Sequence, residues 1–323
     1  MNARVRLRLA QPIAEQSLVR HAAAAAYNQA GDAYIVYADG DAGRLFSFDG
    51  HYAYADRRVW SLIQAKLAER LKSGARTIRI LDAGCGPGTW LRRVVAHANA
   101  LGFTAITARG FDVAEAQIRR ARTLARDVSG LPGVDLTFDV GDIAAPLSEE
   151  DTSVDLFLCL YGVLNHFPTS RHQAIVAEIE RVLAGHFVTT VRTIGSMPTV
   201  YVDSVEKARE FRQDNEHDRC EVEFCDGRHI AFDSHLFAAD ELCSLVGGPL
   251  AIDDLRGLDL FHSRFAPDRR WNPASLEASD QLREELICLE ETFSTDPNFI
   301  DRATHLLLVA RRRPILPRRS RKH

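Results

Sequence analysis

The chain has 323 residues, of which 46% are hydrophobic, and it carries a formal net charge of −4 at pH 7. This composition excludes a disordered chain and suits one large domain or a core with a substantial insertion. The charge is uneven, because the last 13 residues hold seven Arg or Lys and no acid, which leaves −11 on the remainder. An acidic body argues against a broad nucleic-acid footprint. The basic tail is either a solvated terminus or a segment that binds RNA or a membrane surface.

The cysteines and the apolar runs bear on the compartment. Six cysteines are scattered without metal or disulfide spacing, which favours reduced thiols in a cytoplasmic protein and no metal site. The first residues contain no apolar signal segment, and no apolar run approaches the length of a membrane span. Heavy use of Arg and Ala with little Lys is typical of a GC-rich bacterial genome.

The first 74 residues predict helices and an aromatic loop ahead of the first strand. An alanine-rich helix that begins near His21 breaks at Gly31, and a loop rich in Tyr, Asp and Gly follows. An amphipathic helix then covers residues 56–74, with Gly74 as its stop. We interpret this part as a helical lid or cap.

From residue 77 strands and helices alternate, with near-continuous apolar strands that favour a parallel sheet covered on both faces. The expected strands are 78–83, 105–112, 134–142, 154–162 and 186–193, and the expected helices are 90–102, 114–126 and 171–183. Between about 194 and 236 a charged helix and a hairpin turning at Asp226-Gly227 predict an insertion. The alternation resumes with helix 238–246, strand 250–261, helix 275–293 and strand 304–312.

The stretch "ILDAGCGPGTW" joins the first strand to the next helix through Gly84, Gly86 and Gly88. Three glycines at this spacing indicate a tight turn where a ligand comes close to bare backbone. A dinucleotide site uses G-x-G-x-x-G instead, and the acid two residues ahead, Asp82, would repel a pyrophosphate. The predicted ligand therefore has a cationic end and no phosphate at this turn.

The pattern resembles the class I S-adenosylmethionine-dependent methyltransferases, whose first motif is an acid followed by G-x-G-x-G. The resemblance covers roughly residues 75–193 and resumes near 236–312, with "GFDVAEAQIRRAR", "VGDI" and "DLFLCLYGVLNHF" as later motifs. It implies S-adenosylmethionine as the cofactor, ribose hydroxyls on Asp112, adenine beside Asp142 and Ile143, and the methionine moiety at the end of the fourth strand. The turn after "RVL" departs from the family, since it reads "AGHF" where Pro-Gly-Gly is frequent.

The resemblance also implies a fold and a domain division. The fold is α/β, a Rossmann-like seven-stranded mostly parallel sheet with helices on both faces, an N-terminal helical lid and an α/β insertion after the fifth strand. The division is a lid or cap of 1–74, a cofactor-binding core of 75–193, a substrate-flap insertion of 194–236, the remainder of the core at 237–313, and a basic tail of 314–323.

The cofactor contacts that we expect come from the motifs and from one lid residue. They are Asp82, Gly84, Cys85, Gly86, Gly88, Asp112, Val113, Asp142, Ile143, Cys159, Leu160 and Tyr27. Asp112 and Asp142 also suit the role of helix N-cap, and Cys85 suits a small filler in the turn. Tyr27 is either a lid residue that closes over the cofactor or a packing residue of a helical cap.

Catalysis needs an aligned acceptor, and a base only where the acceptor must lose a proton. The catalytic candidates are His166 and Tyr161, just beyond the fourth strand, where ligands of such sheets bind. His166 is either a general base or a locally packed residue, and Tyr161 also suits pocket lining. The expected substrate contacts are Asn165, Tyr201, His235, Phe261, Arg264 and Trp271, where Arg264 is a partner for a substrate carboxylate or a surface ion pair.

The fourth motif narrows the acceptor. "CLYG" lacks the Asn/Asp-Pro-Pro-aromatic signature of base-amine methylation, the Pro-Cys pair of cytosine C5 methylation, and an acid for metal-dependent catechol methylation. The sequence therefore predicts an enzyme that methylates an O, N or C atom of a small metabolite or natural-product intermediate. The alternative is a non-catalytic cofactor- or RNA-binding protein with the same fold. A homodimer is compatible with either function.

Overall fold

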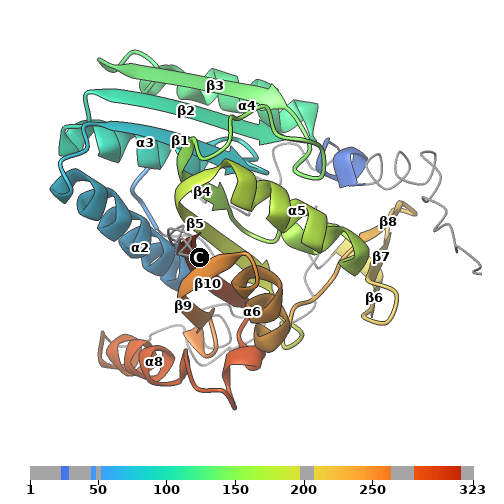
Figure 1. The fold of residues 1–323 in the computed structure, drawn as a ribbon. Coiled ribbons are helices and arrows are strands. Elements are labelled where there is room, and N and C mark those ends of the chain that lie inside the picture. Colours follow the sequence, from blue (N-terminus) through green and yellow to red (C-terminus); the bar gives the residue numbers. More distant parts are fainter. Residues whose placement is uncertain (1–22, 29–44, 49–51, 197–206, 263–279, 314–323) are drawn as a thin grey trace, which may run out of the picture.

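The computed structural model describes residues 23–28, 45–48, 52–196, 207–262 and 280–313. Its centre is a seven-stranded sheet in the order β3-β2-β1-β4-β5-β10-β9 (Figure 1). The strands are β1 (Thr77–Ala83), β2 (Ala105–Asp112), β3 (Val134–Val140), β4 (Val154–Cys159), β5 (Leu183–Arg192), β9 (Leu250–Leu258) and β10 (His305–Arg312). Strand β10 runs antiparallel to both of its neighbours, and the pairs among β1 to β5 are parallel. The predicted Rossmann-like sheet is confirmed.

Helices pack on both faces of this sheet and enclose two separate cores. The helices are α2 (Ala53–Lys72), α3 (Thr89–Leu101), α4 (Glu115–Leu124), α5 (Thr169–Val182), α6 (Ala239–Gly247) and α8 (Asp280–Phe293). Apolar residues of α2, α3 and α4 share one buried cluster with Ile78 and Ile80 of β1. Residues of α5 and α6 share the other with Leu81 and Ala83 of the same strand. Successive strand side chains point to opposite faces, so one apolar strand feeds both cores.

A second, three-stranded antiparallel sheet lies in the insertion, with strands β6 (Ala208–Asp214), β7 (Arg219–Phe224) and β8 (His229–Asp233). The hairpin at Asp226-Gly227 is present, with Gly227 at a φ of 86°. The prediction of a charged helix before this hairpin is wrong, because residues 208–214 form a strand. The charges there make cross-strand contacts: Arg209 bridges to Glu223 at 2.8 Å.

The short helix of residues 23–28 packs against this insertion. Ala26 is buried in one cluster with Cys220, Val222 and Phe232 of the small sheet. Figure 1 shows the helix, drawn in blue, just beyond the carboxyl ends of β2 and β3. Two segments that are about 200 residues apart in sequence therefore lie together at the edge of the sheet where its ligands are expected.

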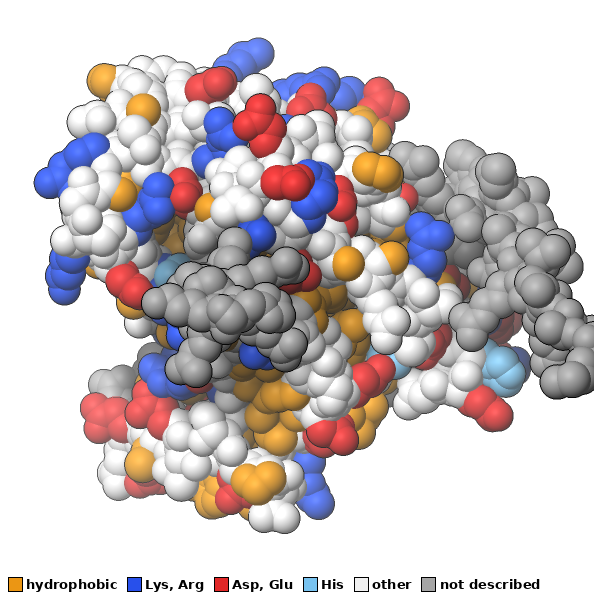
Figure 2. Space-filling view, viewed as in Figure 1, with side chains coloured by type: hydrophobic (Ala, Val, Ile, Leu, Met, Phe, Trp, Pro, Cys, Tyr) orange, Lys and Arg blue, Asp and Glu red, His pale blue; other side chains and the backbone are white. Residues whose placement is uncertain are grey.

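The surface is mixed in charge. Figure 2 shows Lys and Arg side chains interspersed with Asp and Glu on the upper part of the face in view. Many of them are paired, as in the contact of 2.7 Å between Arg181 and Asp151. Among the described helices we find none with the length and hydropathy that crossing a bilayer requires.

Candidate active site

The glycine-rich turn between β1 and α3 adopts a conformation that only glycine takes easily. Gly84, Gly86 and Gly88 have φ values of 67°, 52° and 79°. A Cβ on Gly84 would lie 2.3 Å from Val163, and one on Gly88 would lie 2.7 Å from the ring of Phe138. The turn therefore passes close to β3 and to the segment that follows β4.

Asp112, at the end of β2, ties this turn to the next helix. Its Oδ2 accepts a hydrogen bond of 3.0 Å from the N–H of Gly86, and its Oδ1 accepts one of 2.8 Å from the N–H of Ala114. Burial raises the pKa of Asp112, against the opposing effect of these two hydrogen bonds. A carboxylate has about four acceptor positions, so Asp112 keeps capacity for ligand hydroxyls.

Asp142, which follows β3, is held in a similar way. Its Oδ1 accepts a hydrogen bond of 2.9 Å from the N–H of Ala144 two residues on. The next side chain, Ile143, is 4% exposed and packs in the core on the α5 side of the sheet. The helix N-cap role that the sequence left open is wrong for both Asp112 and Asp142, because Ala114 is the N-cap of α4 and the described residues 141–153 contain no helix. Each carboxylate instead bonds the N–H two residues on, which leaves it acceptor capacity for a ligand.

Asp82, near the end of β1, carries a buried carboxyl group that lacks a hydrogen bond at one oxygen. It is 2% exposed, and its Oδ2 has no hydrogen-bond partner within the residues that the structure describes. Burial, with the charge of Asp112 as a second cause, raises the pKa of Asp82 well above its usual range. A buried carboxyl oxygen without a partner is costly, so a ligand that brings a cation or a donor to it fits this position.

The two cysteines predicted near the cofactor are buried. Cys85 is 8% exposed and Cys159 is 0% exposed. Burial raises the pKa of both thiols, so neither has the character of a nucleophile. The predicted contacts Val113 and Leu160 lie next to Asp112 and Cys159, at the carboxyl ends of β2 and β4.

Tyr161 forms a wall just beyond β4. Its φ of 56° is left-handed, and its N–H donates a hydrogen bond of 2.6 Å to Oγ1 of Thr190. Its ring stacks on Tyr52 with centroids 6.3 Å apart, and its hydroxyl donates to Oδ1 of Asp56. Burial and the charge of Asp56 raise the pKa of Tyr161 well above its usual range, so the hydroxyl stays protonated at neutral pH.

Three buried carboxyl groups near Tyr161 were not predicted from the sequence. Asp56, Asp259 and Glu290 are 7%, 0% and 0% exposed, and they come from α2, the end of β9 and α8. Glu290 accepts hydrogen bonds from three successive backbone N–H groups, those of residues 260–262, at 2.6–2.9 Å. Burial and the charges of Glu290 and Asp56 raise the pKa of Asp259 well above its usual range. The sequence feature that could have indicated this cluster is Asp56, an acid in the first turn of the helix that precedes the glycine motif.

His166 and Tyr27 meet at the opposite side of the site. Nε2 of His166 is 2.7 Å from the Tyr27 hydroxyl, and its Nδ1 is 3.3 Å from the backbone oxygen of Asp233. Burial lowers the pKa of His166 to about 4, so the ring is neutral at pH 7. The lid residue and the base candidate, chosen separately from the sequence, are in direct contact.

The predicted substrate residues have different surroundings. Asn165 is 1% exposed. Its side-chain nitrogen donates hydrogen bonds to the backbone oxygens of Arg192 and His235, and its side-chain oxygen accepts one from the N–H of Arg192. The ring of His235 lies between Asp218, at 2.7 Å, and the carboxylate of Glu241, at 2.8 Å.

Asn165 and His235 thus join the insertion to the core. Of the other predicted contacts, Phe261 places its ring 5.8 Å from that of Phe293. Tyr201, Arg264 and Trp271 lie outside the described residues.

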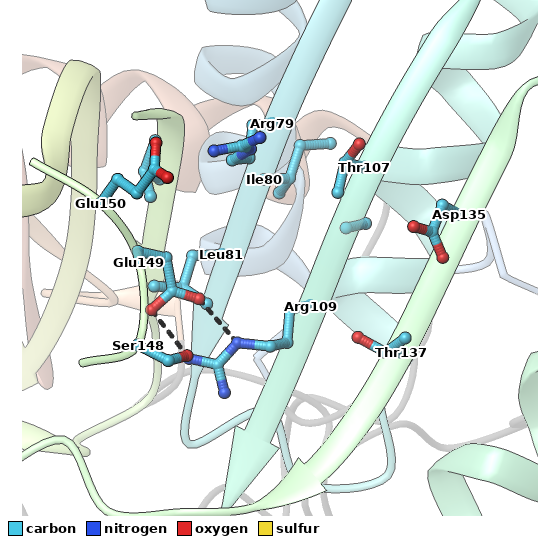
Figure 3. Close-up of a pocket in the computed structure, with 12 residues that line it drawn as sticks. Arg79, Ile80, Leu81, Thr107, Arg109, Asp135, Thr137, Ser148, Glu149 and Glu150 are labelled. Atoms are coloured by element: carbon cyan, nitrogen blue, oxygen red, sulfur yellow. Dashed lines mark hydrogen bonds and ion pairs between the residues drawn. The ribbon is translucent and has the colours of Figure 1, made fainter. Parts of the chain in front are cut away.

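A groove of about 280 Å³ lies elsewhere, on the face of β1, β2 and β3 that residues 148–150 border (Figure 3). Its lining mixes polar and apolar side chains, and Arg109 makes two hydrogen bonds to Glu149 at 2.6 and 2.8 Å. The groove is formed by the middle of the strands, away from the glycine turn, and it is not part of the candidate active site.

Comparison with known proteins agrees with this geometry. Residues 80–186 match the family model described as "Methyltransferase domain". A search of curated proteins finds no significant match. The CcbJ methyltransferase from Streptomyces caelestis is a similar solved structure, with a TM-score of 0.53, 14% identity, 88% of this chain and 98% of that chain covered.

A SAM-dependent methyltransferase from Methanosarcina mazei gives a TM-score of 0.47, with 18% identity, 72% of this chain and 92% of that chain covered. A methyltransferase from Clostridium acetobutylicum gives a TM-score of 0.48, with 12% identity, 79% of this chain and 91% of that chain covered. At these identities the solved structures bear on the fold alone. The sheet order and the turn define a Rossmann-like methyltransferase fold. Within this fold, residues 80–186 are the part that matches the methyltransferase domain model.

Proposed function

We propose that the protein transfers the methyl group of S-adenosylmethionine to an O, N or C atom of a small metabolite or natural-product intermediate. The observation that carries the proposal is the pairing of a bare glycine turn with the buried carboxyl group of Asp82 and the half-buried one of Asp112. Such a site favours a nucleoside with a cationic end and disfavours a phosphate.

The residues proposed to hold the cofactor follow the motif order along the carboxyl ends of the strands. Gly84, Cys85, Gly86 and Gly88 line the turn; Asp82, Asp112, Val113, Asp142, Ile143, Cys159, Leu160 and Tyr27 complete the set. When bound, the cofactor supplies an activated methyl group, and the protein aligns the acceptor with it and excludes water.

The acceptor is proposed to lie between two walls that the chain itself builds. Tyr161, fixed by its bonds to Asp56 and Thr190, forms one wall. His166 forms the other, and in the free protein Tyr27 and the insertion cover it.

The proposal keeps the domain division given above, with 1–74 as lid, 194–236 as substrate flap and 314–323 as basic tail. It also keeps a bacterial, cytoplasmic setting, in line with six free cysteines. A homodimer remains compatible with it.

Calorimetry with S-adenosylmethionine and S-adenosylhomocysteine tests the proposal. We expect both to bind the wild-type protein, and we expect Asp112→Ala to weaken binding by about 1–3 kcal/mol, because hydrogen bonds to a charged group are lost. Asp135→Ala is the matched control, since this exposed carboxylate lies in the groove of Figure 3 and should leave affinity unchanged. Binding of NADH with no binding of either sulfur nucleoside would overturn the proposal.

A further inference from the structure

The contact between Tyr27 and His166 brings a phenol to an imidazole. The hydroxyl is 2.7 Å from Nε2, and the two rings meet edge to face with centroids 5.4 Å apart. The residues are 139 positions apart in sequence, so only the fold brings them together. The hydroxyl of an aromatic ring thus already occupies a position against the base candidate.

The direction of this hydrogen bond follows from the other ring nitrogen. Nδ1 faces the backbone oxygen of Asp233, which can only accept, so Nδ1 carries the proton. Because burial keeps the ring neutral, Nε2 presents a lone pair and the Tyr27 hydroxyl is the donor. The fold therefore presents an oriented hydrogen-bond acceptor to whatever lies at the position of the Tyr27 hydroxyl.

The segment that carries Tyr27 is attached at two further points. Ala26 packs into the apolar face of the small sheet, and the side-chain oxygen of Asn28 accepts a hydrogen bond of 2.9 Å from the N–H of Ala116. Phe232 places its ring 5.6 Å from that of His166, which gives the position a flat apolar side. A flat ring bearing a hydroxyl matches these surroundings in shape and in polarity.

We propose that the Tyr27 hydroxyl occupies the position that the acceptor hydroxyl takes, and that the acceptor is a phenol or an enol methylated on oxygen. The acceptor displaces the Tyr27 side chain and donates its own hydroxyl to Nε2 of His166. During transfer the acceptor O–H bond breaks, Nε2 takes the proton, and the oxygen electron pair forms the new bond to the methyl carbon as the sulfur–methyl bond breaks. The imidazolium then returns the proton to water. This inference rests on the proposed methyltransferase function.

The test is the binding of 4-nitrophenol to the full chain in the presence of S-adenosylhomocysteine, at a pH below the pKa of this phenol so that its hydroxyl can donate. Tyr27→Phe removes the internal competitor and keeps the ring, so we expect binding to tighten about fivefold, the effect of one ordinary hydrogen bond. His166→Ala should weaken binding about tenfold or more, since the acceptor of that bond is lost together with packing surface. The matched amine 4-nitroaniline should bind more weakly than the phenol and should gain less from Tyr27→Phe.

Asn28→Ala is the control for lid opening, because it removes an anchor of the same segment without touching His166. Equal tightening in Asn28→Ala and Tyr27→Phe would overturn the inference, since the effect would then come from loosening the segment. Weaker binding in Tyr27→Phe, equal behaviour of the amine, or no binding of 4-nitrophenol to Tyr27→Phe would overturn it as well. In each case retained binding of S-adenosylhomocysteine leaves the methyltransferase proposal standing, and loss of that binding in the wild-type protein would remove both.

An NMR titration of the His166 imidazole gives a readout that is independent of ligand. We expect the Nε2 resonance to shift in Tyr27→Phe and to stay in place in Asn28→Ala, because only the first variant removes the donated hydrogen bond. An unchanged resonance in Tyr27→Phe would contradict the contact itself.

Discussion

Gly88→Ala tests the turn on which cofactor binding is proposed to depend. Gly88 is the N-cap of α3 with a φ of 79°, and a Cβ there would lie 2.7 and 2.8 Å from two atoms of the Phe138 ring. That ring has little room to turn away, because it is 4% exposed and packs closely against Gly110 as well. An added methyl group must therefore displace the turn, the ring or both.

Gly102→Ala, at the other end of the same helix, is the control that separates the cost of a left-handed backbone from the cost of the steric clash. Its φ is 99° and a Cβ there meets nothing within 4 Å. A left-handed alanine costs about 1–2 kcal/mol at either position. Overpacking adds about 1–3 kcal/mol at Gly88 alone. We expect Gly102→Ala to lower the free energy of unfolding by about 1–2 kcal/mol and Gly88→Ala by about 2–5 kcal/mol.

Urea unfolding and calorimetry with S-adenosylhomocysteine measure the two effects. We expect Gly88→Ala to lose affinity about tenfold or more, as a displacement of about 1 Å in a binding turn can cause, while Gly102→Ala binds as the wild type does. Equal destabilisation by the two substitutions would refute the close-approach argument. A stable Gly88→Ala protein with unchanged affinity would show that the turn does not hold the cofactor.

Three further outcomes are expected. Between pH 6.5 and about 4 the unfolded chain protonates His166 and the folded chain does not, so this residue should contribute about 2–3 kcal/mol to the fall in the free energy of unfolding between pH 7 and 4.5. A shallower fall in His166→Gln by urea titration checks this, and an identical slope contradicts it. Tyr161→Phe should lower that free energy by about 1–3 kcal/mol, because Asp56 loses a hydrogen bond in a buried position; thermal unfolding measures it, and an unchanged midpoint would count against the bond. Glu290→Gln should cost about 1.5–3 kcal/mol, because three backbone N–H groups lose a charged acceptor; the same assay with Glu291→Gln, an exposed neighbour, is its control.

The main sheet was predictable because its strands are short apolar runs and most of them are separated by helices. Strand β2 begins and ends at the predicted residues, and β1 and β10 differ from prediction by a single residue at one end. The glycine turn was predictable for the same local reason, since a left-handed backbone at three spaced positions requires glycine.

Contacts between distant segments could not be predicted in this way. The bonds of Tyr161 to Asp56 and of Tyr27 to His166 join residues 105 and 139 positions apart, and no local period encodes them. The charged run that forms strand β6 predicts a helix, because its charges give no alternation of apolar and polar residues along the segment. They are stabilised by pairing across to β7, which a pattern within one segment does not reveal.

An ion pair holds the connection between β3 and β4 to the main sheet. Among the described residues, 141–153 contain no helix, so this connection does not cover β1 to β3 as α5 covers β4 and β5. The paired hydrogen bonds between Arg109 and Glu149 hold the connection against the sheet instead (Figure 3). Both side chains are largely shielded from water, at 24% and 10% exposure, which makes such a bidentate pair worth more than a surface ion pair. Because Glu149 lies seven residues after Asp142, the pair anchors to β2 the same connection that carries Asp142.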